Sequence, residues 1–139
     1  MRSDKYYITV THGSLTVNVP RDLFTGPDCE FVPEKTAEFR KMIGRRYPWL
    51  SENSIDVLMR NARNEMINTI DEETGGRVAS KQMASKGKFD QAIAHLKEHL
   101  ERNPQDADSW YALGELLCKA GRAEEGYRAM NRGRSLSEK

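Results

Sequence analysis

The pentapeptide His95-Leu96-Lys97-Glu98-His99 has residue types and a spacing that could bind a metal ion. On a helix, histidines four residues apart lie on one face, where both imidazoles could ligate zinc. The H-x-x-E-H pattern is typical of one class of zinc peptidases, which need a third protein ligand well downstream on a larger scaffold. The chain continues only to Lys139. We therefore expect His99 to pack beside Leu100 in a helix seam, and we keep zinc hydrolysis only as a third hypothesis.

A second group of candidate residues combines basic and aromatic side chains. Arg45, Arg46 and Trp49 form its centre. The other basic or aromatic members are Arg40, Lys41, Tyr47, Arg60 and Arg63. Aromatic rings beside arginines can bind single-stranded nucleic acid, and the same residue types are frequent in protein-interface hot spots. Acidic residues are interspersed, so a solvated helix face with ion pairs is the favoured interpretation, and nucleic-acid binding is the alternative.

The overall charge excludes a strong general attraction to polyanions. The chain has 22 Lys and Arg residues against 21 Asp and Glu residues, a formal net charge of +1. No global field therefore draws the protein toward nucleic acid or anionic lipid. No apolar run approaches the ~20 residues of a membrane-spanning helix, and the N-terminus lacks the apolar core of a signal peptide. We expect a cytoplasmic protein that has no membrane partner.

The two cysteines, Cys29 and Cys118, lie far apart and in unlike contexts. This pattern is no disulfide framework, and it favours a reducing compartment. We expect Cys29 to be an exposed loop thiol. Cys118 has no His or Asn neighbour that would indicate a nucleophile, so it is expected to fill a groove or a helix seam. The sequence thus gives no reason to expect a catalytic residue, a metal or a cofactor.

The N-terminal region predicts a β-hairpin and a connecting loop. Alternation of apolar residues with Thr and Asn indicates strands over 5–11 and 14–19, joined by a turn at Gly13. Pro20 then ends the ladder because proline has no amide hydrogen to donate. Residues 21–33 carry turn chemistry and are expected to form a loop.

Two helices are predicted to follow this loop. The first should begin near Glu34 and end between Gly44 and Pro48. Its buried stripe is expected to comprise Phe39, Met42 and Ile43. The second covers residues 52–71, with Ser51 as a good N-cap and apolar residues at three- and four-residue steps.

The C-terminal half of the chain predicts four further helices and carries an internal repeat. The helices are expected near 77–86, 89–102, 107–120 and 123–137, separated by Gly87, Asn103-Pro104 and Gly121. The segment aligns with itself at a period of about 34 residues. The aligned pairs are Gly87 with Gly121, Phe89 with Ala123, Ala92 with Gly126, and Leu96 with Met130. Each repeat is therefore a helical hairpin.

On these residues, the segment 75–137 resembles the tetratricopeptide repeat family. The second unit has the fuller signature, which comprises Trp110, Leu113, Gly114, Leu117, Gly121, Gly126 and Met130. Gly114 and Gly126 would let its two helices approach closely. The opening helix of the first unit departs from the pattern and is expected to be short, because Gly76 occupies the aromatic place and Ser80 the glycine place.

The resemblance implies a ligand groove lined by the first helix of each repeat. The candidate partner contacts that map onto this lining are Arg77, Lys81, Asp108, Tyr111, Glu115 and Lys119. Chaperone adaptors of this family clamp a terminal carboxylate with Lys and Asn, but Ala112 and Glu115 stand where Asn would be needed. The clamp is therefore not expected, and the mixed groove suits an amphipathic helix or an extended peptide. Alternatively, the N-terminal segment of the chain itself fills this groove.

Two repeats are fewer than the ~3 that usually bury a continuous core. The helix at 52–71 could cover the first repeat, and a second copy or a partner could cover the last. The predicted fold is α+β and mostly α, with a β-hairpin and two helices (1–72) packed on two repeat-type helical hairpins (75–137). The predicted function is a non-enzymatic adaptor, chaperone or accessory subunit that binds another protein through the groove or the hairpin edge. A homodimer is the further partner option.

Overall fold

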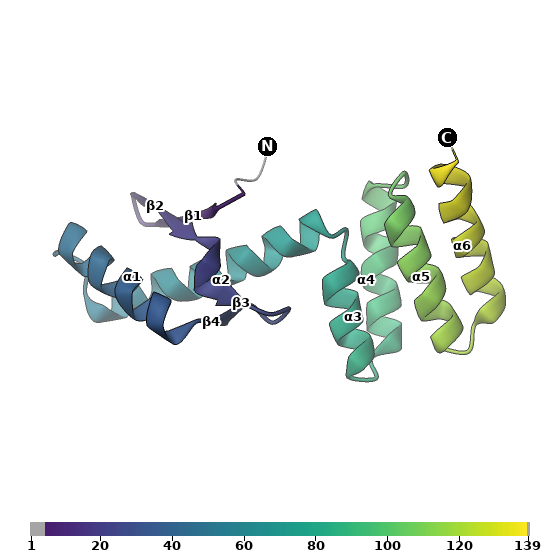
Figure 1. Ribbon diagram of the computed structural model, residues 1–139, viewed down its shortest axis with the longest axis horizontal. Helices are drawn as coiled ribbons and strands as arrows, with labels where there is room; N and C mark the ends of the chain where they lie inside the picture. The colour runs from purple at the N-terminus through teal and green to yellow at the C-terminus, as the bar shows by residue number, and fades with distance from the viewer. Residues whose placement is uncertain (1–4, 139) are drawn as a thin grey trace. The chain divides into compact units, whose positions relative to one another are not determined.

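The computed structural model describes residues 5–138, and its contacts divide the chain into two compact units (Figure 1). The first unit ends at Thr69 and the second begins at Ile70. Each unit has its own buried apolar residues. The fold is α+β and mostly helical, which confirms the predicted class.

The first unit opens with an antiparallel hairpin of β1 (Tyr7–His12) and β2 (Leu15–Pro20). Ile8 pairs with Val19 and Val10 with Val17; these four side chains are buried, whereas the Thr and Asn side chains of the other face are exposed. The period of two thus gives the hairpin one apolar face, as predicted. Gly13 makes the turn with a φ of 62°, a conformation that costs glycine least.

The segment from 21 to 33 is more ordered than the predicted connecting loop. A short 3-10 helix, η1 (Arg21–Leu23), leads into β3 (Phe24–Thr25), which pairs antiparallel with β4 (Glu30–Phe31). The rings of Phe24 and Phe31 lie 5.1 Å apart across this pair. Strands of two residues are too short to show an alternating pattern, so the sequence carries no local signal for them. The prediction of a loop without strands was therefore wrong here.

Cys29 is buried, so the expectation of an exposed thiol was wrong. It lies in the β3–β4 connection with 1% of its surface accessible and a φ of 53°. Its amide donates to the Gly26 carbonyl at 3.1 Å, and Arg63 Nε donates to the Cys29 carbonyl at 3.0 Å. Burial raises the pKa of the Cys29 thiol, and the Arg63 charge opposes this effect. A thiol so placed is a packing residue.

Two amphipathic helices complete the first unit. α1 (Pro33–Arg46) has proline in its first turn, where the missing amide hydrogen costs nothing. α2 (Glu52–Glu73) follows Ser51, whose Oγ accepts a hydrogen bond from the Ser54 amide at 3.1 Å. The buried stripe of α2 contains the predicted Ile55, Leu58, Met59, Ala62 and Met66. At its end the prediction of Ile70 was wrong, because Thr69 is buried and Ile70 only partly buried.

The buried stripe of α1 is narrower than predicted. Phe39 and Ile43 are buried, but Met42 is 45% exposed. Phe39 and Ile43 are one turn apart and define the centre of the buried face, whereas Met42 lies about 100° from Ile43 around the helix. The prediction that Met42 belongs to the core was therefore wrong, and its side chain adds apolar surface to the outside of α1.

The described part of the second unit contains the last turn of α2 and four further helices, in two antiparallel pairs (Figure 1). They are α3 (Arg77–Ser85), α4 (Phe89–Arg102), α5 (Ala107–Lys119) and α6 (Ala123–Ser137). These bounds agree with the predicted ranges to within a residue, and α3 is short, as expected. No helix within residues 5–138 combines the length and apolar character needed to cross a membrane.

The core of the second unit lies between α4, α5 and α6. Its buried members are Ala92, Ile93, Leu96, Leu100, Leu113, Leu116, Leu117 and Ala129. A Cβ added at Gly114 would lie 2.5 Å from Met130 Cγ and 2.7 Å from the Gly126 carbonyl oxygen, and one added at Gly126 would lie 2.5 Å from Cys118 Sγ. The two glycines therefore allow α5 and α6 to pack at close distance, as the repeat signature predicts.

The outward face of α6 is mostly polar. Its exposed residues include Glu124, Arg128, Asn131, Arg132, Arg134 and Ser135, and Tyr127 is the large exposed aromatic residue among them. The outward face of α6 is therefore largely hydrophilic.

Candidate functional site

A groove of about 580 Å³ lies between α3 and α5 in the second unit. Small and apolar side chains form its floor: Ala84, Phe89, Ala112 and Leu116. Hydroxyl-bearing and charged side chains complete the lining: Ser80, Ser85, Arg77, Lys81, Glu115 and Lys119. A cavity of this size and mixed lining is typical of ligand sites.

The charges around the groove are unequal. Arg77, Lys81 and Lys119 place three cations against the single carboxylate of Glu115. Lys119 Nζ lies 3.0 Å from Glu115 Oε1, an exposed pair of the i,i+4 type that adds little stability. Arg77 Nη1 lies 3.7 Å from Asp106 Oδ1. The groove is therefore positive at the α3 side, where Lys81 lies.

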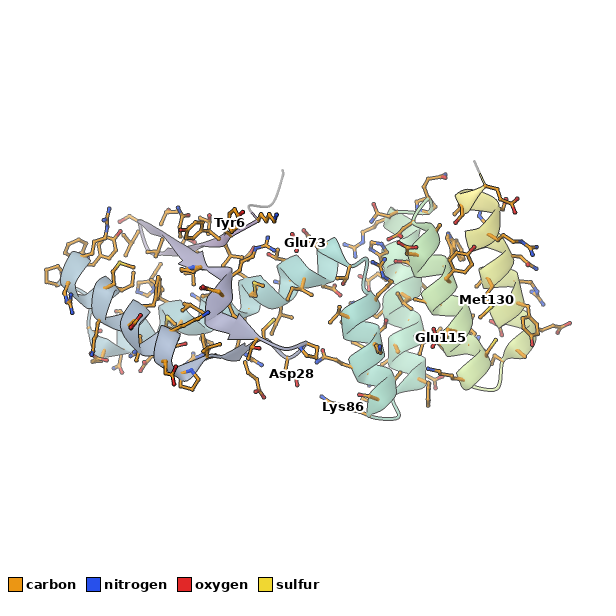
Figure 2. The ribbon with its side chains drawn as sticks, in the orientation of Figure 1. Tyr6, Asp28, Glu73, Lys86, Glu115 and Met130 are labelled. Carbon is orange, nitrogen blue, oxygen red and sulfur yellow. The ribbon has the colours of Figure 1, made fainter. Side chains whose placement is uncertain are left out.

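The structure brings together four of the six partner contacts that the sequence suggested. Arg77, Lys81, Glu115 and Lys119 line one groove. Asp108 and Tyr111 lie outside this lining, on the first turns of α5. The Tyr111 ring lies against α6 instead. A Cβ built on Gly133 of α6 would lie 3.3 Å from Tyr111 Cδ2. Figure 2 labels Glu115 on α5.

Sequence reasoning did not include Ser80, Phe89 or Leu116 in the groove. Phe89 was recognised as a repeat-signature residue, and its position as the first residue of α4, directly after the α3–α4 turn, is the signal that could have placed it at the groove edge. Leu116 is nearly buried in the core and contributes to the floor with its remaining surface. These residues supply the apolar contact area that the charged set lacks.

A polar cluster fixes the start of α3, and with it Arg77 and Lys81. Ser109 Oγ lies 2.9 Å from the Gly75 carbonyl oxygen, to which it donates, and 2.9 Å from Asp106 Oδ2. His99 Nε2 lies 3.0 Å from the same Asp106 oxygen. Gly75 has a φ of 59°, and a Cβ there would lie 2.5 Å from Ser109 Oγ. Only glycine fits this position.

Asp106 carries the charge of this cluster and caps α5. Its Oδ1 accepts a hydrogen bond from the Ser109 amide at 3.3 Å. Burial by itself would raise the pKa of Asp106, but hydrogen bonds from His99 and Ser109 and the charge of Arg77 together lower it below the usual value. The carboxylate is therefore ionised and structural at neutral pH.

The cluster of His99, Asp106 and Ser109 is no Ser-His-Asp catalytic site. In a catalytic triad the serine hydroxyl contacts the imidazole, which removes its proton. Here Ser109 contacts the aspartate and a backbone carbonyl, and its side chain is fully buried. A reacting substrate could not reach its hydroxyl, so the cluster serves the fold.

His95 and His99, the candidate zinc ligands, each have an aspartate partner of their own. His95 Nε2 lies 2.7 Å from Asp71 Oδ1, and His99 Nε2 lies 3.0 Å from Asp106 Oδ2. Within the described part of the chain, no set of three or more His, Cys, Asp or Glu residues is arranged to hold a metal ion. His99 is buried beside Leu100, as the repeat register predicts.

The basic and aromatic cluster of the first unit divides into internal and exposed members. Arg40 pairs with Glu52 at 3.0 Å and with Asp56 at 2.7 Å. Arg63 donates to the carbonyl oxygens of Cys29 and Asp28. Trp49, by contrast, is 71% exposed. Arg45 and Arg46 lie in the last turn of α1 and are exposed as well.

The family model of the tetratricopeptide repeat matches residues 83–136. The match confirms the resemblance over this segment, which runs from the end of α3 to α6. Comparisons with curated proteins and with solved structures gave no significant match. Tetratricopeptide repeats typically bind proteins or peptides and typically carry no catalytic activity, so the segment is a protein-interaction module in character.

Proposed function

We propose that the protein is a non-enzymatic cytoplasmic adaptor, chaperone or accessory subunit that binds a segment of another protein in the groove between α3 and α5. The observation that carries this proposal is the groove itself, about 580 Å³ with an apolar floor and charged walls, on a repeat type that binds proteins. Ala84 and Ala112 leave room for the bound backbone, while Phe89 and Leu116 offer apolar contacts.

The charged wall gives the groove its selectivity in this proposal. Lys81 lies on the exposed side of α3, and Arg77 lies one turn before it on the same face. Such rim charges influence partner choice and association rate more than affinity. Asp108 and Tyr111 are not required for binding in this proposal, since they lie outside the lining.

Two substitutions test the groove. Lys81→Glu reverses a wall charge, and Ala112→Leu fills the floor with a good helix former. We expect the first to weaken partner capture about tenfold and the second to abolish it, because the steric block acts on any bound segment. The measurement is affinity capture from the lysate of the native host at moderate salt, with nuclease added, read by mass spectrometry.

Lys86→Glu is the matched control. It makes the same change of charge in the turn after α3, outside the lining (Figure 2). A protein partner that is captured equally by all three variants and the parent chain would exclude the groove as its binding site.

The alternative is a single-stranded nucleic-acid binder that uses Arg45, Arg46 and Trp49. The exposure of Trp49 favours it, since base stacking needs a free ring. It predicts binding to an oligothymidylate at low salt, with an affinity that falls steeply as salt rises. The absence of binding at low salt would remove this alternative.

A further inference from the structure

Trp49 is presented on a tight turn between α1 and α2. The Leu50 amide donates to the Tyr47 carbonyl at 3.0 Å, which closes a four-residue turn over Tyr47, Pro48, Trp49 and Leu50. Pro48 occupies the second position, where its fixed φ suits the turn. Trp49 follows in the third position, and 71% of its surface is exposed.

Both ends of this turn are fixed by helix caps. The Tyr47 amide donates to the Ile43 carbonyl at 2.9 Å at the end of α1, and Ser51 caps the start of α2. The rings of Tyr47 and Trp49 lie 5.4 Å apart at 75°, an edge-on contact. The backbone at Trp49 is therefore fixed by the turn and the two caps before any partner binds, which lowers the entropy cost of binding.

Apolar and positive side chains of the last turns of α1 precede this turn in the chain. Met42 is 45% exposed, and it lies one helical turn before Arg45 and Arg46, on the same face of α1. Arg46 Nε lies 3.1 Å from the Tyr47 hydroxyl oxygen, to which it donates. We call the set Met42, Arg45, Arg46, Tyr47 and Trp49 the turn patch.

We propose that the turn patch is a second docking surface, which binds an acidic segment of a protein partner that also carries an apolar side chain. Tryptophan and arginine are the residue types that most often dominate binding energy in protein interfaces. The apolar anchor of the partner covers Trp49 and Met42, and its carboxylates pair with Arg45 and Arg46. Glu38 lies one turn before Met42, so the acidic end of the partner is oriented toward the turn.

The charge arrangement favours a protein over a nucleic acid. A single strand needs cations along the path of its phosphates. Arg40 is neutralised by Glu52 and Asp56, and Arg63 is held by backbone carbonyls in the β3–β4 connection. Two basic residues of the cluster, Arg40 and Arg63, are thus engaged within the unit, whereas Lys41 and Arg60 are exposed. Fewer cations remain to follow a phosphate chain, and Arg45 and Arg46 suffice for a short acidic segment.

The test uses the fluorescence of Trp49 in the full chain. The probes are three synthetic peptides that share a leucine-containing sequence and differ in carrying Glu, Gln or Lys at the same positions, together with an oligothymidylate. We expect the Glu peptide to shift the emission to shorter wavelength as Trp49 becomes buried. The shift should be absent in Trp49→Phe, where Trp110 is the one remaining tryptophan.

Variants of the patch and of the groove separate this proposal from the first one. R45Q/R46Q should weaken binding of the Glu peptide about two- to thirtyfold, since each of the two exposed charge pairs contributes about 0.2–1 kcal/mol. Lys81→Glu should leave it unchanged. The proposal is overturned if the Glu peptide causes no shift, if the Lys peptide causes the same shift, if R45Q/R46Q binds as the parent does, or if only the oligothymidylate binds.

Discussion

At the scale of single residues, Asp106 combines several roles in the second unit. It caps α5, contacts His99 and Ser109, and lies near Arg77 of the groove wall. The pKa of this carboxyl group is lowered, because hydrogen bonds and a positive charge outweigh its burial. A carboxylate with a lowered pKa stabilises the folded state above its unfolded pKa and loses that contribution as the pH falls through the folded value.

Asp106→Asn should therefore destabilise the second unit at neutral pH by about 1–2 kcal/mol, because it removes charge-assisted hydrogen bonds but keeps a capping residue. The difference from the parent chain should shrink in acid, below the ordinary carboxyl pKa. Amide hydrogen exchange of α5, measured at both pH values, reports the effect locally. Asp108→Asn on the exposed side of the same turn is the control and should change little. An equal loss of stability at both pH values would show that the charge of Asp106 does not stabilise the unit.

At the scale of elements, the closeness of α5 and α6 depends on two glycines that face each other. The Cβ distances of 2.5 to 2.8 Å at Gly114 and Gly126 are shorter than real Cβ contacts, and their neighbours include backbone oxygens that cannot move aside. Gly44 in α1 differs from these two glycines, because no atom lies within 4 Å of a Cβ added there. The position therefore has room for a side chain.

Gly114→Ala should destabilise the second unit by about 1–3 kcal/mol through overpacking. Gly44→Ala should instead stabilise the first unit by roughly 0.5–1 kcal/mol, since alanine is the better helix former and has free space there. Chemical denaturation of both variants measures the change in the free energy of unfolding. Hydrogen exchange of α1 and of α5 then shows which unit gains or loses stability. A stable Gly114→Ala variant would mean that α6 can shift outward at no cost.

At the scale of the whole molecule, α2 continues from the first unit into the second. The 22-residue helix contributes its buried stripe up to Met66 to the first unit, while Asp71 in its last turn contacts His95 of α4. The helix ends where Gly75 and Gly76 both have positive φ, at 59° and 80°. The helix is therefore regular up to Glu73, and a turn with two glycines follows it.

Asp71→Ala should raise hydrogen exchange in the last turn of α2 and in the Gly75–Gly76 turn, and should leave residues 52–66 unaffected. The reason is that the carboxylate at 2.7 Å from His95 holds only the end of the helix. Glu72→Ala, at the next and exposed position, is the control. Equal changes along the whole of α2 would show that the helix frays as one piece.

Much of the fold could be predicted because its signals are local. Glycine and proline breaks and three- and four-residue apolar steps predicted α4 and α6 with the bounds observed. The repeat register predicts that Arg77, Lys81, Glu115 and Lys119 line one groove, and all four lie in the lining observed. The same register misplaced Tyr111, because the packing of α6 at Gly133, rather than the position of Tyr111 on its helix, decides where the ring lies.

What the sequence determined by itself is the order and type of the main elements and the repeat class of the C-terminal segment, predicted over 75–137 and matched by the family model over 83–136. These follow from backbone preferences and periodicity within a few turns of chain. Only the tertiary structure decided that Cys29 is buried, that Met42 and Trp49 are exposed together, and that Arg40 and Arg63 are held internally. Burial and pairing depend on segments distant in sequence, and no local pattern records which side of a helix they cover.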